Sequence, residues 1–247
     1  MPTSETLIIA IAFVAAAALY ASVGHAGASA YLAVMGLFEF APAAMKPTAL
    51  ALNILVAAIA TIRFYRAGLF TWSLYWPFAI VSIPAAFVGG ATILPARWYK
   101  VAVGLVLLYA AVWMFRSALR PITRAPHPPP LWAALFAGIT IGFLSGLTGV
   151  GGGIFLSPLL LYMGWSEVRA TSGVAAPFIL VNSIAGLLGH LSSLAQIPAN
   201  IPIWAAAVAI GGWLGATYGS RRAPPPVLRQ LLSLVLVIAG AKLVFGG

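Results

Sequence analysis

Three long stretches of the chain contain no charged side chain. Residues 67–96, 125–166 and 170–220 lack Asp, Glu, Lys and Arg altogether. Each stretch exceeds the roughly 20 apolar residues that one helix needs to cross a bilayer, so several spans must follow one another directly. Their residues form continuous blocks of Ala, Leu, Val and Ile rather than the alternating segments of barrel strands. The sequence therefore predicts an all-α polytopic membrane protein.

The overall composition supports this interpretation. Charged residues make up 6% of the chain and hydrophobic residues 62%, whereas a soluble domain has about 25% charged residues. The 13 basic and 3 acidic residues lie scattered between apolar blocks. Such scatter is typical of membrane topology and lipid-headgroup contact rather than of a nucleic-acid patch. We expect a multi-pass protein of the cell (inner) membrane, with the lipid bilayer as a partner and no nucleic acid.

The chain offers few side chains for catalysis. It has no Cys and no Asp, and its acids are Glu5, Glu39 and Glu167. Thiolate sites, paired carboxylates and metal sites therefore have almost nothing to be built from. The absence of a GxxxxGK[ST] motif argues against ATP-driven transport by this chain. We expect no enzyme activity, no catalytic residue, no cofactor and no metal.

Charges, Pro and Gly divide the chain into two sets of five apolar segments. The first set is 6–23, 26–38, 47–63, 73–93 and 98–116, and the second is 131–147, 152–164, 170–188, 203–219 and 227–245. The Pro-rich stretch between them is too stiff and polar to be a span. We therefore predict a first transmembrane repeat at 1–120, a linker at 121–130 and a second transmembrane repeat at 131–247.

Two motifs recur at matching places in the two sets. "SVGHAGASAYL" matches "LTGVGGGIFLS", which pairs Gly24 with Gly149 and Gly27 with Gly152. "MKPTALA" matches "VRATSGV", which pairs Lys46 with Arg169 and Thr48 with Thr171. Internal duplication with weak identity is typical of secondary transporters built from repeats. The pattern predicts two homologous halves.

Segments 26–38 and 152–164 are short for a membrane span. Each half thus has four long helices plus one short or re-entrant helix, giving 8–10 transmembrane segments in all. If the short segment re-enters, the halves are parallel and the basic residues divide almost evenly between the two sides. If it crosses, the halves are inverted and one side collects Arg63, Arg66, Arg116, Arg120, Arg124, Arg169, Arg221, Arg222 and Arg229, against Lys46, Arg97, Lys100 and Lys242. The excess of Lys and Arg on cytoplasmic loops favours inverted repeats with the N-terminus outside.

The glycine clusters are the main candidate binding residues. Four glycines in positions 149–153 will not readily hold a regular helix, and unwound backbone at membrane depth occurs where protein buries it or where it lines a cavity. Free N–H groups at the start of the next helix would form an anion site. We predict substrate binding by Gly149, Gly151, Gly152 and Gly153, and by Gly24 and Gly27 in the first half. Close helix packing is the alternative.

Other polar residues fall beside these clusters. His25 stands where the second half has Val150, either as an anion donor and proton acceptor or as a satisfied interfacial histidine. Thr48, Thr171 and Ser172 are predicted to donate to the anion, and Lys46 and Arg169 to attract it, although helix capping and snorkelling explain each singly. Further expected roles are polar lining for Ser22, Asn53, Thr148 and Asn182, and proton coupling for His25 and Glu39.

At "GLTGVGGGIFLSPLLLYMGWSEVRATS" the sequence resembles the TauE/SafE family, also called TSUP or sulfite exporter and toluenesulfonate uptake permeases. The family pattern is a GxGGG run that leads into "PLLL" and then into a helix beginning with Thr-Ser or Thr-Asn. The first half fits in order, with "YRAGLFTW" like the family's basic loop, but "GHAGAS" is depleted in glycine.

The resemblance covers essentially the whole chain. It implies a permease for small sulfur-containing anions such as sulfite, thiosulfate, sulfonates or sulfoacetate. A non-transporting structural or assembly component of the membrane is the alternative. Lipid-facing helices could support a homodimer, and the oligomeric state stays open.

Overall fold

The computed structural model describes residues 3–119, 126–222 and 226–245. Within these ranges the chain is helical and contains no strand. The helices are α1 (Thr3–Ala21), α2 (Ala28–Leu37), α3 (Pro42–Arg66), α4 (Trp72–Ala91), α5 (Ala96–Leu119), α6 (Leu131–Thr148), α7 (Gly153–Tyr162), α8 (Val168–Gly189), η1 (Leu191–Gln196), α9 (Ile201–Gly219) and α10 (Pro226–Phe245). The prediction of an all-α protein is confirmed. Residues 121–125 of the predicted linker, with Arg124, lie outside the described residues, as does Arg120 directly before it.

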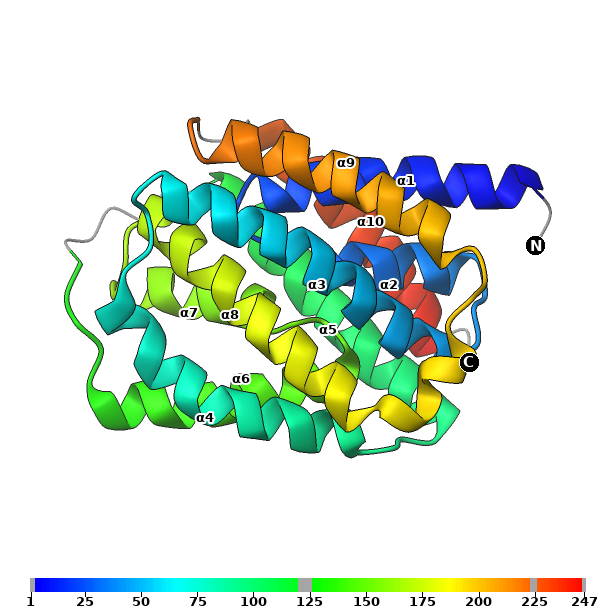
Figure 1. The fold of residues 1–247 in the computed structure, drawn as a ribbon, viewed down its shortest axis with the longest axis horizontal. Helices are drawn as coiled ribbons and strands as arrows, with labels where there is room; N and C mark the ends of the chain where they lie inside the picture. The colour runs from blue at the N-terminus through cyan, green and yellow to red at the C-terminus, as the bar shows by residue number, and fades with distance from the viewer. Residues whose placement is uncertain (1–2, 120–125, 223–225, 246–247) are drawn as a thin grey trace.

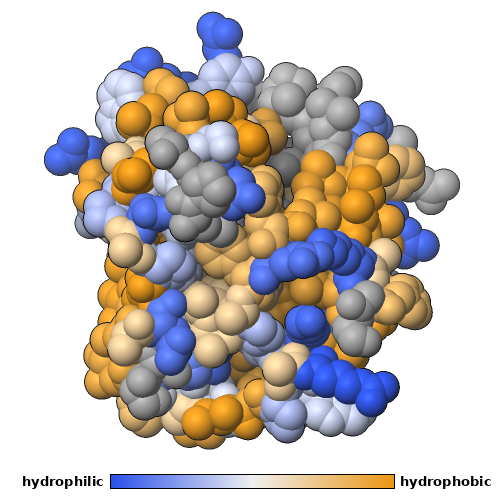
Figure 2. All heavy atoms as spheres, turned by 90° about the vertical axis from the view of Figure 1, so that its right-hand side faces the viewer, coloured by the Kyte–Doolittle hydropathy of each residue, from blue (hydrophilic) through white to orange (hydrophobic). Residues whose placement is uncertain are grey.

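Seven of the described helices are long and apolar enough to cross a bilayer, namely α1, α3, α4, α5, α6, α8 and α9. Many of their large hydrophobic side chains are exposed, such as Ile11 of α1 and Phe136 of α6. Figure 2 looks onto one end of the molecule, where hydrophilic side chains are scattered over the face and hydrophobic ones cover the flanks. The flanks are the surface that faces lipid, and the chain is a multi-pass membrane protein.

Successive helices reverse direction along the chain. In Figure 1, α1 begins and α10 ends at one end of the molecule, whereas α5 ends and α6 begins at the opposite end. Arg66 ends α3, Arg116 lies in the last turn of α5, and Arg169 lies in the first turn of α8, all at that opposite end. We name it the basic end. Because cytoplasmic loops carry the excess of Lys and Arg, we infer that the basic end faces the cytoplasm.

Two helices are much shorter than the rest, as the sequence predicts. α2 and α7 have 10 residues each. Each begins after a glycine-containing turn in the middle of the fold, and they run toward opposite ends of the molecule (Figure 1). Gly27 and Gly152 are their N-caps, both in the left-handed region. The turns therefore place two helix N-termini near the centre of the protein.

Glycine stripes bring two pairs of long helices together. Gly138, Gly142 and Gly146 of α6 face the main chain of α4, and Gly211 and Gly215 of α9 face the main chain of α1, with Gly219 against Ser22 directly after it. A Cβ atom at any of these glycines would meet a main-chain carbonyl of the facing segment at less than van der Waals distance. Small residues at four-residue spacing let membrane helices approach this closely, which explains why α4 packs on α6 and α9 on α1.

Four further helix contacts are related by an exchange between the first five α-helices and the last five. α4 packs on α8 and α9 packs on α3, while α3 packs on α8 and α5 on α10. When each helix is replaced by the one five places along the chain, the α4–α8 contact becomes the α9–α3 contact, and the α3–α8 and α5–α10 contacts map onto themselves. Two halves of similar fold would pack in this way.

Candidate functional site

The first break is the turn of residues 22–27 between α1 and α2. Gly24 and Gly27 adopt φ angles of 76° and 104°, a region that side chains with a Cβ rarely enter. A Cβ at Gly24 would lie 2.7 Å from Cβ of Ser172. The first break therefore packs tightly against the beginning of α8, a helix of the other half.

The second break is the turn of residues 149–152 between α6 and α7. Gly149, Gly151 and Gly152 have φ angles of 84°, 82° and 84°. A Cβ at Gly149 would lie 3.3 Å from Cγ of Lys46, near the start of α3. Each break thus packs against the long helix that follows the break of the other half.

Backbone donors are free at the second break. The N–H groups of Gly151, Gly152 and Gly153 have no acceptor among the described residues. The hydroxyl of Ser145, which is 0% exposed, also lacks a partner there, and its Cβ lies 3.4 Å from the position of a Cβ at Gly152. The first N–H groups of a helix are unsatisfied by its own backbone and carry its positive dipole end. These unpaired donors allow the second break to bind a hydrogen-bond acceptor.

His25 joins the two breaks. Its Nδ1 lies 3.1 Å from the carbonyl oxygen of Val23, and its Nε2 lies 3.1 Å from the carbonyl oxygen of Gly153. A carbonyl oxygen only accepts, so both contacts are hydrogen bonds when both ring nitrogens carry a proton. The ring of Tyr20 lies beside it, 6.3 Å away between centroids. The geometry suits an imidazolium between the breaks.

Asn53 of α3 is a second connection between the breaks. Its Oδ1 accepts from the backbone N–H of Ala28 at 3.1 Å, at the start of α2. Its Nδ2 donates to Oγ of Ser183 at 3.0 Å and lies 3.5 Å from the carbonyl oxygen of Val150. The amide is 0% exposed, so it ties α2, α8 and the second break together away from water.

The hydrogen bonds of Asn53 lead to a prediction about stability. Replacing Asn53 by Leu leaves the Ala28 N–H and the Ser183 hydroxyl buried without their partner, which should cost about 2 kcal/mol. Asn182 is the matched control, because it is equally buried but donates only to the carbonyl of Phe178 in its own helix. Asn182→Leu should therefore cost much less. Thermal unfolding in detergent measures both variants, and an equal or larger loss for Asn182→Leu would contradict this account.

Lys46 and Arg169, which were predicted to attract the anion, each reach with their charged group to the C-terminal end of another helix. Nζ of Lys46 is 2.8 Å from the carbonyl oxygen of Gly90 and 3.3 Å from that of Thr92, at the end of α4. Nη2 of Arg169 is 3.0 Å from the carbonyl oxygen of Ser220, at the end of α9. Each cation stabilises the negative end of a helix. Lys46 is 3% exposed, so its charge is held inside the protein beside the second break.

The predicted hydroxyl side chains differ in their hydrogen-bond partners. Thr48 and Thr171 are buried and their hydroxyls lack a partner among the described residues. Ser172 instead donates to the carbonyl of Val23 in the first break at 2.9 Å. The hydroxyl of Ser22 donates to a carbonyl at the end of α1, and that of Thr148 to a carbonyl of its own helix. Of these five hydroxyls, only that of Ser172 has a hydrogen bond to a break of the other half.

Glu39 lies apart from the breaks. Its side chain is 80% exposed and pairs with Lys242 of α10 at 3.1 Å. The backbone at Glu39 has a φ of 59°, at the turn after α2. Among the described residues no three His or Glu side chains gather where they could hold a metal ion.

Some residues at the breaks were not predicted as site residues. Ser29 donates to the hydroxyl of Tyr20 at 2.8 Å, and Ser145 and Ser183 face the second break as described above. Ser145 stands directly before the glycine run in "SGLTGVGGG", which was a usable signal. Tyr20 and Ser183 belong to ordinary apolar helix patterns. They lie at the centre because of the way α1 and α8 each pack in the fold.

Space between the breaks is small in this conformation. A cavity of about 10 Å³ lies between Tyr20, His25, Ser29 and Val150. That volume is about what one water molecule needs. The centre is therefore closed in this conformation.

Comparison with known proteins identifies the family of this chain. The chain matches the family described as "Sulfite exporter TauE/SafE" over residues 8–243. It is 45% identical to the "Probable membrane transporter protein y4hK" of Sinorhizobium fredii, covering 98% of this chain and 99% of that one. It is 22% identical to the "Probable membrane transporter protein YunE" of Bacillus subtilis, covering 74% and 71% of the two chains. No solved structure matches the chain. With its full-length match, its membrane helices and its paired glycine breaks, the chain belongs to the TauE/SafE family of membrane transporters.

Proposed function

We propose that the protein is a secondary transporter of small sulfur-containing anions, such as sulfite, thiosulfate, sulfonates or sulfoacetate, and not an enzyme. The observation that carries the proposal is the set of free N–H groups at Gly151–Gly153 beside the unpaired, buried hydroxyl of Ser145. Sulfur oxyanions present several acceptor oxygens on one small centre, which such donors can bind. The description of the matching family names sulfite export, and the relatives are named only as membrane transporters.

The electrostatics of the centre support an anionic substrate. α2 and α7 both begin there, so their positive dipole ends lie near each other. An imidazolium at His25 and the buried Lys46 add positive charge on either side of the second break. Discontinuous helices whose N-termini point at an anionic group are a recurring design of secondary transporters. Arg169 acts at longer range, from the basic end.

The two halves supply the moving parts. We propose that 1–120 and 131–247 are inverted repeats joined by 121–130, which the exchanged helix packing supports. His25, Asn53 and Ser172 are the links between the halves at the breaks. Alternating access then consists of one half rocking against the other, with these links breaking and re-forming around the anion.

Transport by purified protein in liposomes tests the function. We expect uptake of at least one of labelled sulfite, thiosulfate and a sulfonate, above the background of protein-free liposomes and reduced by an excess of the unlabelled anion. Circular dichroism and a single gel-filtration peak verify that the protein is folded. If none of the three anions moves through folded protein, the transport proposal fails and a structural or assembly role takes its place.

A further inference from the structure

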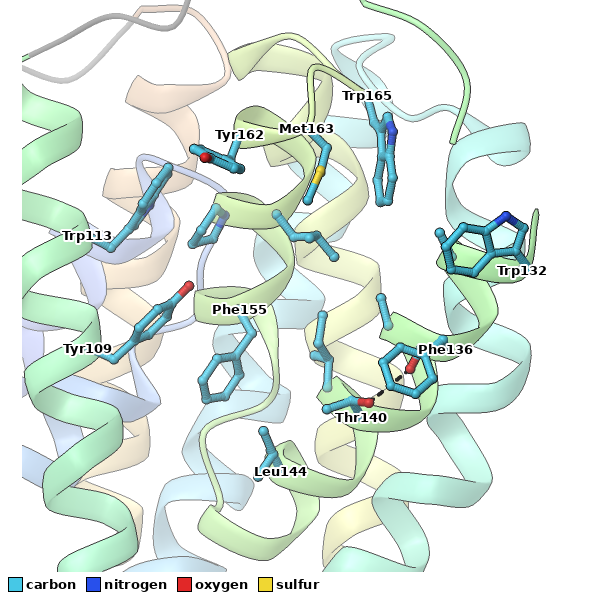
Figure 3. Close-up of a pocket in the computed structure, with 15 residues that line it drawn as sticks. Tyr109, Trp113, Trp132, Phe136, Thr140, Leu144, Phe155, Tyr162, Met163 and Trp165 are labelled. Atoms are coloured by element: carbon cyan, nitrogen blue, oxygen red, sulfur yellow. Dashed lines mark hydrogen bonds between the residues drawn. The ribbon is translucent and has the colours of Figure 1, made fainter. Parts of the chain in front are cut away.

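A large apolar groove lies on the flank of the molecule, away from the links between the breaks. It has a volume of about 630 Å³ and runs between α5, α6 and α7. Seven of its fifteen lining residues are aromatic, among them Tyr109 and Trp113 from α5, Trp132 and Phe136 from α6, and Phe155 and Tyr162 from α7 (Figure 3). The volume lies within the range of pockets that bind a small organic ligand.

The corresponding place in the first half is filled by protein. There the short helix α2 is covered by α10, and Gly36 of α2 lies so close to Leu243 that a Cβ would approach it to 3.2 Å. In the second half α5 stands in the position of α10, but it meets α7 through the stacked rings of Tyr109 and Phe155, 5.6 Å apart. The outer face of α7 thus has an apolar position that no helix in the described part of the chain fills.

The groove matches one lipid acyl chain in its length and in its depth in the membrane. Its wall on α6 extends from Trp132 to Leu144, about 18 Å at the rise of an α-helix, and one leaflet of the hydrocarbon core is about 15 Å deep. Figure 3 shows Tyr162, Met163 and Trp165 at one end and Thr140 and Leu144 at the other. Trp and Tyr typically lie at membrane interfaces, so the groove runs from an interface into the membrane interior.

A cation stands at the interfacial end. Arg116 lies three residues beyond Trp113, hence on the same face of α5, and it is exposed at the basic end. A guanidinium binds phosphate with paired hydrogen bonds. A helix of a second copy is about 10 Å across, whereas the rings of Tyr109 and Phe155, which line the α5 and α7 sides of the groove, stack with their centroids 5.6 Å apart. Charge and width both favour a phospholipid.

We propose that this groove binds one acyl chain of an anionic phospholipid from the cytoplasmic leaflet, with its phosphate at Arg116. The bound chain covers α7 on the face where α10 covers α2. It thereby supports the short helix whose N-terminus forms the second break. Lipid binding in this groove is independent of which anion the protein transports.

Native mass spectrometry of the detergent-solubilised protein tests the lipid site. With added phosphatidylglycerol, the wild type should retain one tightly bound lipid per chain. Thr140→Trp places an indole in the groove, and retention should fall by about tenfold. Ile139→Trp is the matched control, because Ile139 is the adjacent exposed residue of α6 but does not line the groove. Equal retention in the two variants would place the lipid elsewhere and overturn the proposal.

The headgroup is tested by a second pair of variants. Arg116→Gln should abolish the preference for phosphatidylglycerol over phosphatidylcholine. Arg66→Gln, which removes another exposed arginine at the basic end, should preserve that preference. The opposite result would remove Arg116 from the site. If the wild type instead runs as a dimer that only Thr140→Trp dissociates, the groove is a protein interface and the lipid proposal is wrong.

Discussion

Gly152→Val should reduce anion uptake in liposomes to the protein-free background, a loss of about tenfold or more. Gly152 is the N-cap of α7 with a φ of 84°, and a Cβ there would lie 3.0 Å from Cε1 of Phe178 and 3.2 Å from Cγ2 of Ile141. Valine in this conformation costs about 1–3 kcal/mol of backbone strain. The larger effect is on function, because the side chain crowds Ser145 and displaces the free N–H groups that form the acceptor site.

Gly68→Val is the matched control for this result. Gly68 also has a positive φ, 70°, in the turn after α3, but nothing lies within 4 Å of an added Cβ. The strain is therefore comparable while the second break is untouched, and uptake should stay near the wild-type rate. Equal loss in both variants would show that strain alone stops transport. Normal uptake by Gly152→Val would remove the second break from the mechanism.

The apparent KM for a sulfonate should rise by about tenfold as the external pH increases from about 5.5 to 8, and His25→Gln should make it independent of pH. A sulfonate keeps one charge over this range, so the response reports the protein. Protonated His25 adds a positive charge and donates to both Val23 and Gly153, whereas the neutral ring can donate to only one of them. Glutamine still donates hydrogen bonds but does not titrate.

The other two histidines provide the controls. His127 is exposed and lies in the described part of the connection between the halves. Burial and the Lys46 ammonium lower the pKa of His190, which opposes protonation of its ring. His127→Gln and His190→Gln should therefore keep the pH response of the wild type. A response that survives in His25→Gln but disappears in either control would assign proton coupling to another residue.

Much of the fold could be predicted because the bilayer restricts the choices. A chain with uncharged runs longer than a span has to be helical, since only helices of this composition satisfy their backbone in lipid. The short segments 26–38 and 152–164 were predicted from length alone and appear as α2 and α7. The glycine runs that precede them were predicted to interrupt helices, and Gly24, Gly27, Gly149, Gly151 and Gly152 all have positive φ. In each case the signal is local, so one sequence contains it.

The partners across the centre could not be predicted. The sequence places "MKPT" after the first break and "VRATS" after the second, but it does not indicate which break each motif contacts. In the structure, Gly24 packs against Ser172 and Gly149 against Lys46, so each break contacts the helix that follows the break of the other half. Lys46 and Arg169 were expected to face an anion, and the structure shows their donors on the carbonyls that end α4 and α9. Whether their charge still attracts the substrate remains a proposal.

The sequence by itself thus determined that the chain is a helical membrane protein, where its short helices begin and which residues break them, because hydropathy, charge and glycine act on neighbouring residues. The tertiary structure decided which groups meet: His25 with Gly153, Asn53 with Ala28 and Ser183, and the open groove beside α7. These contacts join residues from distant helices. Their geometry depends on how glycine stripes and side chains pack between helices, and no periodicity along a single chain encodes that packing.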